Sequence, residues 1–466
     1  MNTQKSVAAS AFLALALSSC MSVAHPTDPG VRHAGTDGGP PPSLPGLKAD
    51  ELVFFQDGLT RFLAVEVVSG GANNGLGPRF NSNQCASCHI QPFVGGSSPS
   101  VNPLPAVASA AGATNKVPWF IVANGPIREA RFVSSNGVPD GGVHNLFVIT
   151  HRSDAGRCSL AQPDFLPAGN GLSGQGGNPN IIFRIPTPML GAGLIEAIPD
   201  STILANQKAD ADAKAKLGVA GHPNAHLSGN VNRSANDGTI TRFGWKAQNK
   251  SLLMFAGEAY NVEMGISNEL FPQERDETAS CQGGNVTPND TLNFPPAGGN
   301  TPATAVLSDI EAFANFMRML APPVPAAPTA SATKGEALFK SVGCALCHTA
   351  MLSTGAGIAS GSATSPSAAL SNQSVALYSD LLVHHMGTGL ADGITQGSAG
   401  PDEFRSAPLW GVGQRVFFLH DGRTSNLVQA IEEHASHGSE ANQVIRKFNS
   451  LSERDQQNLI NFLRSL

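Results

Sequence analysis

Two short stretches fix the fold of this chain: Cys85-Ala86-Ser87-Cys88-His89 and Cys344-Ala345-Leu346-Cys347-His348. Each holds two cysteines separated by two residues and followed directly by a histidine, which is the signature of covalent haem attachment. Two thiols at this spacing reach the two vinyl groups on one edge of a porphyrin, and the adjacent histidine then lies under the iron as its proximal ligand. The sequence therefore predicts two covalently bound haem c groups.

Zinc binding and thiol redox chemistry fit the two motifs less well. A zinc site would need further paired ligands nearby, but the remaining cysteines, Cys20, Cys158 and Cys281, are isolated in the sequence. A redox-active cysteine pair would not explain why a histidine follows in both copies. In an oxidising compartment we expect Cys158 and Cys281 to form a disulfide, and the alternative is that they are two buried free thiols.

The first twenty residues are predicted to be an export signal. Lys5 precedes an apolar run from Val7 to Leu17, which is too short to cross a bilayer as a helix. Leu17-Ser18-Ser19-Cys20 resembles the bacterial site of lipid attachment, which would leave Cys20 acylated and anchor the chain to the outer membrane. Cleavage after Ser22-Val23-Ala24 is the alternative. Both routes predict a periplasmic protein.

Two stretches rich in proline and glycine divide the chain. Residues 21–46 are predicted to be a flexible tether, and residues 321–333 a linker between two halves, because dense proline cannot continue a helix. The composition, with 41% hydrophobic and 14% charged residues, 50 Gly and 33 Pro, indicates a globular, loop-rich protein. Its formal net charge of -6 gives no basic footprint for nucleic acid. A mildly acidic surface is compatible with a small basic redox protein as partner.

Each half of the chain contains one haem motif and ends in a similar amphipathic segment. One segment opens at Ser308 and the other at Ser452, and in both an acid follows three residues later, which predicts a capping box. We expect a mainly α fold with two cytochrome c-like domains, at residues 47–320 and 334–466. The first is enlarged by a loop-rich insertion over roughly 95–240.

The sixth position of each iron decides what the haem does, since a filled site transfers electrons and an open site binds peroxide or oxygen. Trp245 in the first half and His420 in the second each stand seven residues before a leucine that opens an apolar stretch. After that stretch comes Glu263 in the first half and His434 in the second. These two side chains are therefore predicted to occupy comparable sites.

Three segments carry a resemblance to a known family. They run from Glu403 to Arg423, from Pro188 to Ala197, and from Leu382 to Gly387. On these residues and the two haem motifs, the chain after about residue 48 resembles the di-haem oxidoreductase family. Its relatives are the bacterial di-haem cytochrome c peroxidases and the methylamine-utilisation di-haem enzyme.

The resemblance implies an enzyme in which electrons from a small redox protein enter at the C-terminal haem and reduce hydrogen peroxide at the N-terminal haem. In the peroxidases the position matching Trp245 supplies a tryptophan between the haems, and the one matching Glu263 supplies the distal acid–base. The position matching His434 is a methionine that ligates the second iron. A histidine there predicts a bis-histidine haem of lower potential.

Several alternatives stay open. The second iron could instead be ligated by His384, His385 or Met386, or by His437. Trp245 is equally compatible with a packed core aromatic, and Glu263 with an ordinary surface carboxylate. His420 is expected to neighbour the second haem without ligating it.

The alternatives extend to function. No histidine closely follows His89, the nearest being His144 and His151, which favours an open first iron. The rival function is an electron-transfer cytochrome in which both irons are six-coordinate, and a third alternative is an open iron that oxidises another substrate. Relatives bind calcium between the domains, but Arg415 and Phe417 replace a threonine and a proline there, so the resemblance gives calcium little support.

Overall fold

The structure is a computed structural model of the chain. It describes residues 25–32, 39–67, 75–77, 79–110, 113, 117–144, 146–148, 165, 180–228, 236–273, 289–293, 301–356 and 367–466. The predicted export signal with Cys20 and the predicted Cys158–Cys281 disulfide lie outside these residues. Within the described ranges, none of the helices is long and apolar enough to cross a lipid bilayer.

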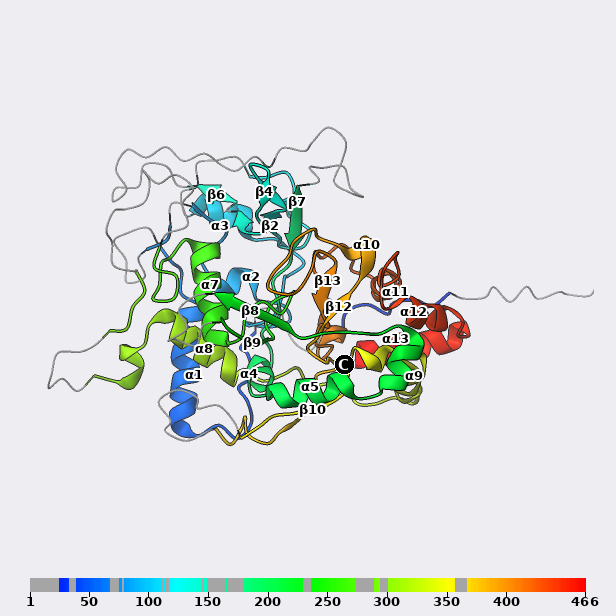
Figure 1. Cartoon of the computed structure of the whole chain (residues 1–466). Coiled ribbons are helices and arrows are strands. Elements are labelled where there is room, and N and C mark those ends of the chain that lie inside the picture. Colours follow the sequence, from blue (N-terminus) through cyan, green and yellow to red (C-terminus); the bar gives the residue numbers. More distant parts are fainter. Residues whose placement is uncertain are drawn as a thin grey trace, which may run out of the picture.

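Helices supply most of the regular structure in the described residues (Figure 1). The α-helices are α1 (Ala49–Phe62), α2 (Cys85–Cys88), α3 (Leu104–Ala110), α4 (Ala192–Glu196), α5 (Asp200–Lys208), α6 (Ala211–Leu217), α7 (Leu252–Met264), α8 (Asp309–Met319), α9 (Ala330–Val342), α10 (Gly387–Leu390), α11 (Leu427–Glu432), α12 (Asn442–Asn449) and α13 (Glu453–Ser465). Single 3-10 turns are η2 (Ala303–Val306), η3 (Cys344–Leu346) and η4 (Val412–Gln414).

The strands are short and pair antiparallel. They are β1 (Arg79–Phe80), β2 (Glu129–Phe132), β3 (Ser134–Ser135), β4 (Val138–Pro139), β5 (Val143–His144), β6 (Phe147–Val148), β7 (Ile181–Arg184), β8 (Asn224–Ser228), β9 (Asn236–Thr241), β10 (Leu352–Ser353), β11 (Ser374–Val375), β12 (Val383–His385) and β13 (Glu403–Arg405). One sheet has three strands in the order β5-β2-β7, and the other strands form pairs: β1-β6, β3-β4, β8-β9, β10-β11 and β12-β13. The fold is mainly α, as the sequence predicted.

In each half an early helix crosses the helix that ends that half, and a glycine lies at the crossing. A Cβ added to Gly58 on α1 would lie 2.3 Å from the carbonyl oxygen of Ala312 on α8. A Cβ added to Gly335 on α9 would lie 2.0 Å from the carbonyl oxygen of Asn458 on α13. Only glycine permits so close an approach of two backbones. The repeated crossing supports the internal duplication inferred from the sequence.

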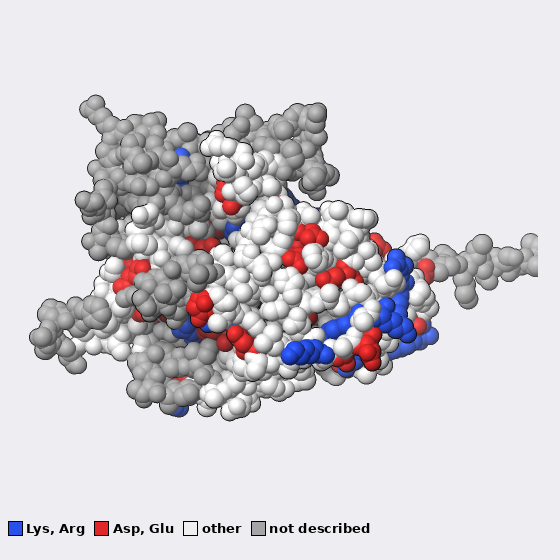
Figure 2. Space-filling view, viewed as in Figure 1, with Lys and Arg blue, Asp and Glu red and all other residues white. Residues whose placement is uncertain are grey.

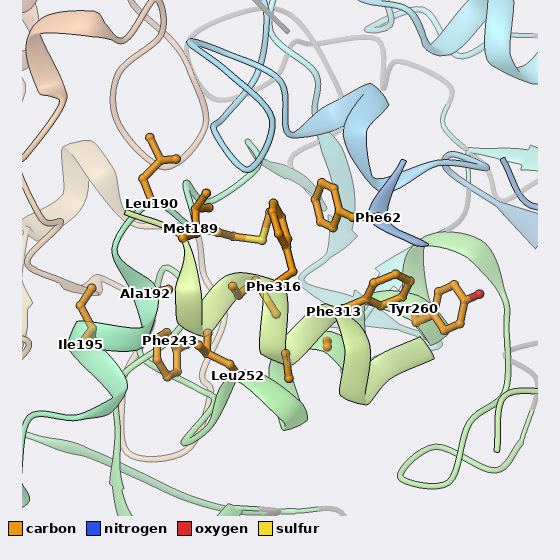
Figure 3. Packing of buried hydrophobic residues seen from close by; sticks show 14 of the residues in the cluster. Phe62, Met189, Leu190, Ala192, Ile195, Phe243, Leu252, Tyr260, Phe313 and Phe316 are labelled. Atoms are coloured by element: carbon orange, nitrogen blue, oxygen red, sulfur yellow. The ribbon is translucent and has the colours of Figure 1, made fainter. Parts of the chain in front are cut away.

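Aromatic side chains fill the core around the first crossing (Figure 3). The ring of Phe62 on α1 lies 5.0 Å from that of Phe316 and 6.2 Å from that of Phe313, both on α8. Tyr260 on α7 meets Phe313 edge-on at 5.1 Å. Such tilted and edge-to-face pairs add to the stabilisation from burial. The three helices form one wall of the space beside the first haem motif.

The predicted capping boxes differ in outcome. The Ser452 side chain accepts a hydrogen bond from the Asp455 amide at 3.2 Å, as expected. The Ser308 side chain makes no capping hydrogen bond. Instead the Asp290 carboxylate accepts from the amides of Asp309 and Ile310 at 2.6 and 3.0 Å. A carboxylate from another segment satisfies the free N–H groups of a helix start as well as a local serine does.

The described parts of the predicted tether pack against the protein. The carboxylate of Asp28 lies 2.6 Å from the guanidinium of Arg464 on α13, and both side chains are only 5% exposed. The Leu44 amide donates to the Met319 carbonyl at 2.7 Å, and Leu44 is buried. At the predicted linker, residues 321–329 form no helix or strand and α9 begins at Ala330, before the linker was expected to end.

Candidate functional site

A cavity of about 1160 Å³, which includes its open mouth, lies beside the first haem motif. Cys85, Cys88 and His89 line it together with residues of β2, β7, α7 and α8. The three motif residues therefore face one open space, and a cofactor held at the motif would lie in it.

The side chain of His89 has the orientation and the protonation state that an iron ligand requires. Its Nδ1 lies 3.0 Å from the carbonyl oxygen of Gly96, which makes Nε2 the nitrogen available to iron. This is the arrangement that orients metal-binding histidines. Burial lowers the pKa of His89 to about 4, so the ring is neutral near pH 7, and neutral imidazole is the form that binds metal. The residues fit a haem attached at Cys85 and Cys88.

The wall of the first cavity is charged. Glu129 and Arg131 alternate along β2 and therefore point to the same side, and both line the cavity. Arg131 Nε lies 2.6 Å from Glu129 Oε1. Across the sheet Glu129 is in register with Arg184 of β7, which also lines the cavity. Glu258 on α7 completes this charged set.

Glu263 lies one residue before the end of α7 and reaches the same cavity. The amide nitrogen of the Asn81 side chain donates to its Oε2 at 2.6 Å. Burial raises the pKa of Glu263 to about 8, and the charge of nearby Glu129 adds to the effect. Burial alone would raise the pKa of Glu129 too, but the charge of Arg131 outweighs it and the pKa is lowered. The two carboxyl groups share one cavity and influence each other's pKa.

A second cavity of about 1380 Å³, again including its open mouth, lies beside the second motif. Its wall is largely apolar, and it also holds His348 and His434. His348 Nδ1 lies 3.1 Å from the Tyr378 carbonyl, and His434 Nδ1 lies 2.7 Å from the Ala430 carbonyl. Both Nε2 atoms are thus left free on the wall of one cavity. Burial lowers the pKa of both rings, to about 4 for His348. The pair fits a bis-histidine haem.

His384 also lines the second cavity, but both of its ring nitrogens are engaged. Nδ1 lies 2.9 Å from the carboxylate of Glu440, and Nε2 lies 3.0 Å from that of Asp380. Burial opposes the shift, but Cys347 and Asp380 raise the pKa of His384 well above its usual value. A doubly hydrogen-bonded imidazolium has no lone pair for iron.

The other candidate ligands of the second iron differ in whether they line the second cavity. His385 is half exposed and pairs with Asp402 and Glu403, and neither it nor His437 is among the residues that line the cavity. Met386 does line it, as does His434. Of the sequence alternatives, these two side chains share a cavity with His348 and have an atom free to ligate.

Trp245 lines both cavities. Its indole nitrogen donates to the carbonyl of Ile185 at 2.9 Å, which fixes the ring. Its ring meets that of His420 edge-on at 6.5 Å, and His420 stacks on Phe404 at 4.3 Å. Both His420 and Phe404 belong to the second cavity's wall. The indole therefore lies between the two spaces in which the haems are expected.

Two charged residues of this site, Glu129 and Arg131, were missed in the sequence. They lie in the insertion, whose structure the sequence did not reveal. The available signal was the alternation of charged Glu129 and Arg131 with apolar Ala130 and Phe132. In a half-buried strand such alternation puts like residues on one face, but it cannot tell which face meets a cavity.

A comparison with protein families agrees with this geometry. The sequence model of the family described as "di-haem oxidoreductase, putative peroxidase" matches residues 178–466. The match includes Trp245, Glu263, His434 and the second haem motif. The first motif lies before it. No curated protein sequence matches the chain.

Solved structures give only weak likenesses. The hydrazine synthase of Kuenenia stuttgartiensis is 13% identical with a TM-score of 0.35, covering 100% of this chain and 98% of that one. The di-haem peroxidase BthA of Burkholderia thailandensis E264 is 15% identical with a TM-score of 0.28, covering 60% and 86%. A MauG-like protein associated with microbial copper homeostasis is 13% identical with a TM-score of 0.27, covering 66% and 95%. At these TM-scores the likenesses carry no argument.

Proposed function

The chain belongs to the di-haem oxidoreductase family, and from this premise we propose that it is a peroxidase. In this proposal electrons enter at the second cavity and hydrogen peroxide is reduced at the first. The supporting observation is the contrast between the cavities: His348 shares its cavity with His434, whereas His89 is the one histidine among the described residues that line the first.

The protein's own contribution is attachment, orientation and proton handling. Cys85, Cys88 and His89 would hold one haem c, and Cys344, Cys347 and His348 the other. Haem iron, when bound, supplies electron transfer in one cavity and cleavage of the peroxide O–O bond in the other.

Glu263 is proposed as the acid–base group of the first cavity. With its pKa raised to about 8, the carboxyl holds a proton at neutral pH. It can deliver that proton to an oxygen atom of a peroxide bound beside it. The hydrogen bond from Asn81 fixes the carboxyl so that its protonated oxygen is not free to rotate away.

The second cavity is proposed as the point of electron entry, with His434 as the sixth ligand and Trp245 on the route to the first. The partner would be a small redox protein. Figure 2 shows Lys and Arg side chains gathered over the end of the molecule that carries α12 and α13. Arg446 and Lys447 are exposed there, and Val444 and Ile445 of the same helix line the second cavity. This local charge favours an acidic partner, although the net charge of the whole chain is negative.

Export to the periplasm and an acyl anchor at Cys20 are part of the proposal. They rest on the sequence of the N-terminal residues, which lie outside the described part of the chain. A covalent, thioether-bound cofactor and an exported chain are mutually consistent features.

The testing experiment is stopped-flow visible spectroscopy of the half-reduced protein mixed with hydrogen peroxide. We expect rapid reoxidation in the wild type and a loss of about 10²-fold to 10⁴-fold in Glu263→Gln, the range for removal of a general acid–base group. Asp50→Asn is the control, because Asp50 is an exposed carboxylate on α1 of the same half and lines neither cavity. An unreactive wild type with two low-spin haem spectra would refute the peroxidase.

One observation favours a second candidate, an electron-transfer cytochrome. Met189, Met264 and Met317 line the first cavity, and a thioether can fill the sixth position of a haem iron. That function predicts no binding of cyanide or carbon monoxide to either iron. The same spectra distinguish the two candidates, since an open first iron binds these ligands.

A further inference from the structure

Two carboxylates approach each other in the first cavity from separate parts of the chain. Glu129 comes from β2 in the insertion, and Glu263 comes from the end of α7. Both carboxyl groups line the same cavity, and burial together with the charge of Glu129 raises the pKa of Glu263. Two ionised carboxylates in one buried space repel each other, and neither can donate a hydrogen bond to the other. The pair is therefore expected to hold one proton at neutral pH.

The surroundings decide which group holds the proton. Arg131 lies 2.6 Å from Glu129 and stabilises its ionised form, and Arg184 opposite it in the sheet acts in the same direction. In the described part of the chain, Glu263 has no such close cation. Its Oε2 accepts from the Asn81 amide at 2.6 Å, and the two charged groups that influence it, Glu129 and Arg131, act in opposite directions. The proton is accordingly on Glu263.

Glu129 and Glu263 are each held by a neighbouring side chain, and a further hydrogen bond fixes that neighbour in turn. Arg131 Nη1 donates to the Gly141 carbonyl at 2.8 Å, so the guanidinium cannot swing away from Glu129. Asn81 Oδ1 accepts from the Leu146 amide at 2.6 Å, so the amide that donates to Glu263 cannot turn away. A pair held on both sides is suited to passing a proton between defined atoms.

We propose that Glu129 and Glu263 act on peroxide as one unit, with the Glu129 carboxylate accepting a proton and the Glu263 carboxyl donating one. Arg131 is a positioning residue that keeps Glu129 ionised before peroxide arrives. This inference rests on the peroxidase function proposed above and adds Glu129 to it as a second catalytic residue.

The proton and electron balance closes. One proton leaves peroxide for a Glu129 oxygen, and one proton leaves Glu263 for the oxygen that departs as the O–O bond breaks. The pair thus still carries a single proton and the same net charge. In the complete reaction, hydrogen peroxide takes up two protons from solvent and two electrons from two molecules of a reduced one-electron redox protein, and two water molecules form. A lone carboxyl would have to lose and regain its proton in turn.

Infrared spectroscopy of the resting protein tests the pair without any turnover. The difference spectrum between the wild type and Glu263→Gln at neutral pH should contain the carbonyl stretch of a protonated carboxyl, and this band should titrate away as the pH rises. Taking the difference removes the bands of Glu66 and Asp290, whose pKa values burial also raises. In Glu129→Gln the neighbouring negative charge is gone, so the midpoint should move to lower pH. In Arg131→Gln the ionised Glu129 loses its cation, so a second protonated carboxyl should appear. Asp50→Asn, at an exposed carboxylate on α1, should change neither band nor midpoint.

Stopped-flow kinetics distinguish failure of the Glu129–Glu263 proposal from failure of the proposed peroxidase function. In stopped flow Glu129→Gln should react with peroxide about 10²-fold more slowly than the wild type, and Asp50→Asn at the wild-type rate. Unchanged haem spectra in the variants exclude misfolding. A wild type that reacts, with Glu129→Gln equally fast and its infrared midpoint unmoved, overturns the pair and leaves the peroxidase. A wild type that does not react overturns the peroxidase, whatever the infrared bands show.

Discussion

The two cavities have similar motif histidines but differ in the other residues that line them. In both, the motif histidine lies about 3 Å from a backbone carbonyl, 3.0 Å for His89 and 3.1 Å for His348, and burial lowers its pKa to about 4. Opposite them the first cavity presents Glu129, Glu263 and Arg131, whereas the second presents an apolar wall with His434. The shared motif fixes the cofactor, and the opposite wall decides its chemistry.

The difference has a structural source. The charged wall of the first cavity comes from β2 and β7, which lie in the insertion, and from α7. In the second cavity α12 supplies Val444, Ile445 and Phe448 to the wall. The charged wall of the first cavity thus depends in part on strands from the segment that was predicted to be an insertion.

The largest change should follow from opening the second iron. His434→Ala removes the proposed sixth ligand and leaves an apolar pocket, so the second cavity should become able to bind an external ligand. Spectroscopic titration with cyanide should rise from one equivalent per wild-type protein to two in the variant. Met386→Ala is the control and should stay at one. A second equivalent in the Met386 variant alone would assign the ligand to Met386.

A smaller effect should appear in the pH dependence of stability, and it should be confined to the first half. Burial raises the pKa of Glu66 and of Asp290 to about 7 and that of Glu263 to about 8. These groups keep protons in the folded state that the unfolded chain releases above about pH 4.5. Stability therefore falls as the pH rises from about 4.5 to about 8.

In the second half the carboxyl of Glu440 is shifted in the opposite direction. Burial would raise the pKa of Glu440, but His384 lowers it to about 2, so this group contributes stability above its unfolded pKa and loses it only as the pH falls towards 2. Thermal unfolding followed at each haem should show the first half melting on the order of several degrees lower at about pH 8 than at about pH 5.5. Equal shifts in both halves would contradict the contrast.

The smallest effect should come from the residue that the cavities share. Trp245→Phe keeps an aromatic wall but removes the indole donor to the Ile185 carbonyl, which should cost about 0.5–1.5 kcal/mol of unfolding free energy. If the indole also lies on the electron route, electron transfer between the haems should slow in flash experiments while peroxide binding is unchanged. Transfer at the wild-type rate would leave Trp245 a packing residue.

Much of the site could be predicted from local sequence because its parts are local. The haem motifs need only neighbouring residues, and the helix ending each half shows its apolar face in its own spacing, as in Ile310, Phe313 and Phe316. The capping of that helix could not be predicted, since Asp290 reaches the helix start at Asp309 from a separate segment. The partner of Glu263 stayed hidden for the same reason.

The choice among ligands for the second iron shows the limit most clearly. The sequence favoured His434, through its match to the ligand position of related peroxidases, and left His384, His385, Met386 and His437 as alternatives. The structure engages both nitrogens of His384 with carboxylates and leaves His385 on the surface. Whether a histidine nitrogen is free depends on which acids fold against it, and those acids are distant in sequence.

The sequence by itself determined the mainly α fold class and the family, and it predicted two haem attachment sites and Glu263 as a candidate acid–base. These predictions follow from spacing, because haem attachment motifs and helix periodicity act over a few residues. Only the tertiary structure decided that Glu263 and Glu129 line one cavity, that Arg131 pairs with Glu129, and that one tryptophan borders both cavities. Those properties depend on burial and on charges brought together from distant parts of the chain, and no local pattern encodes them.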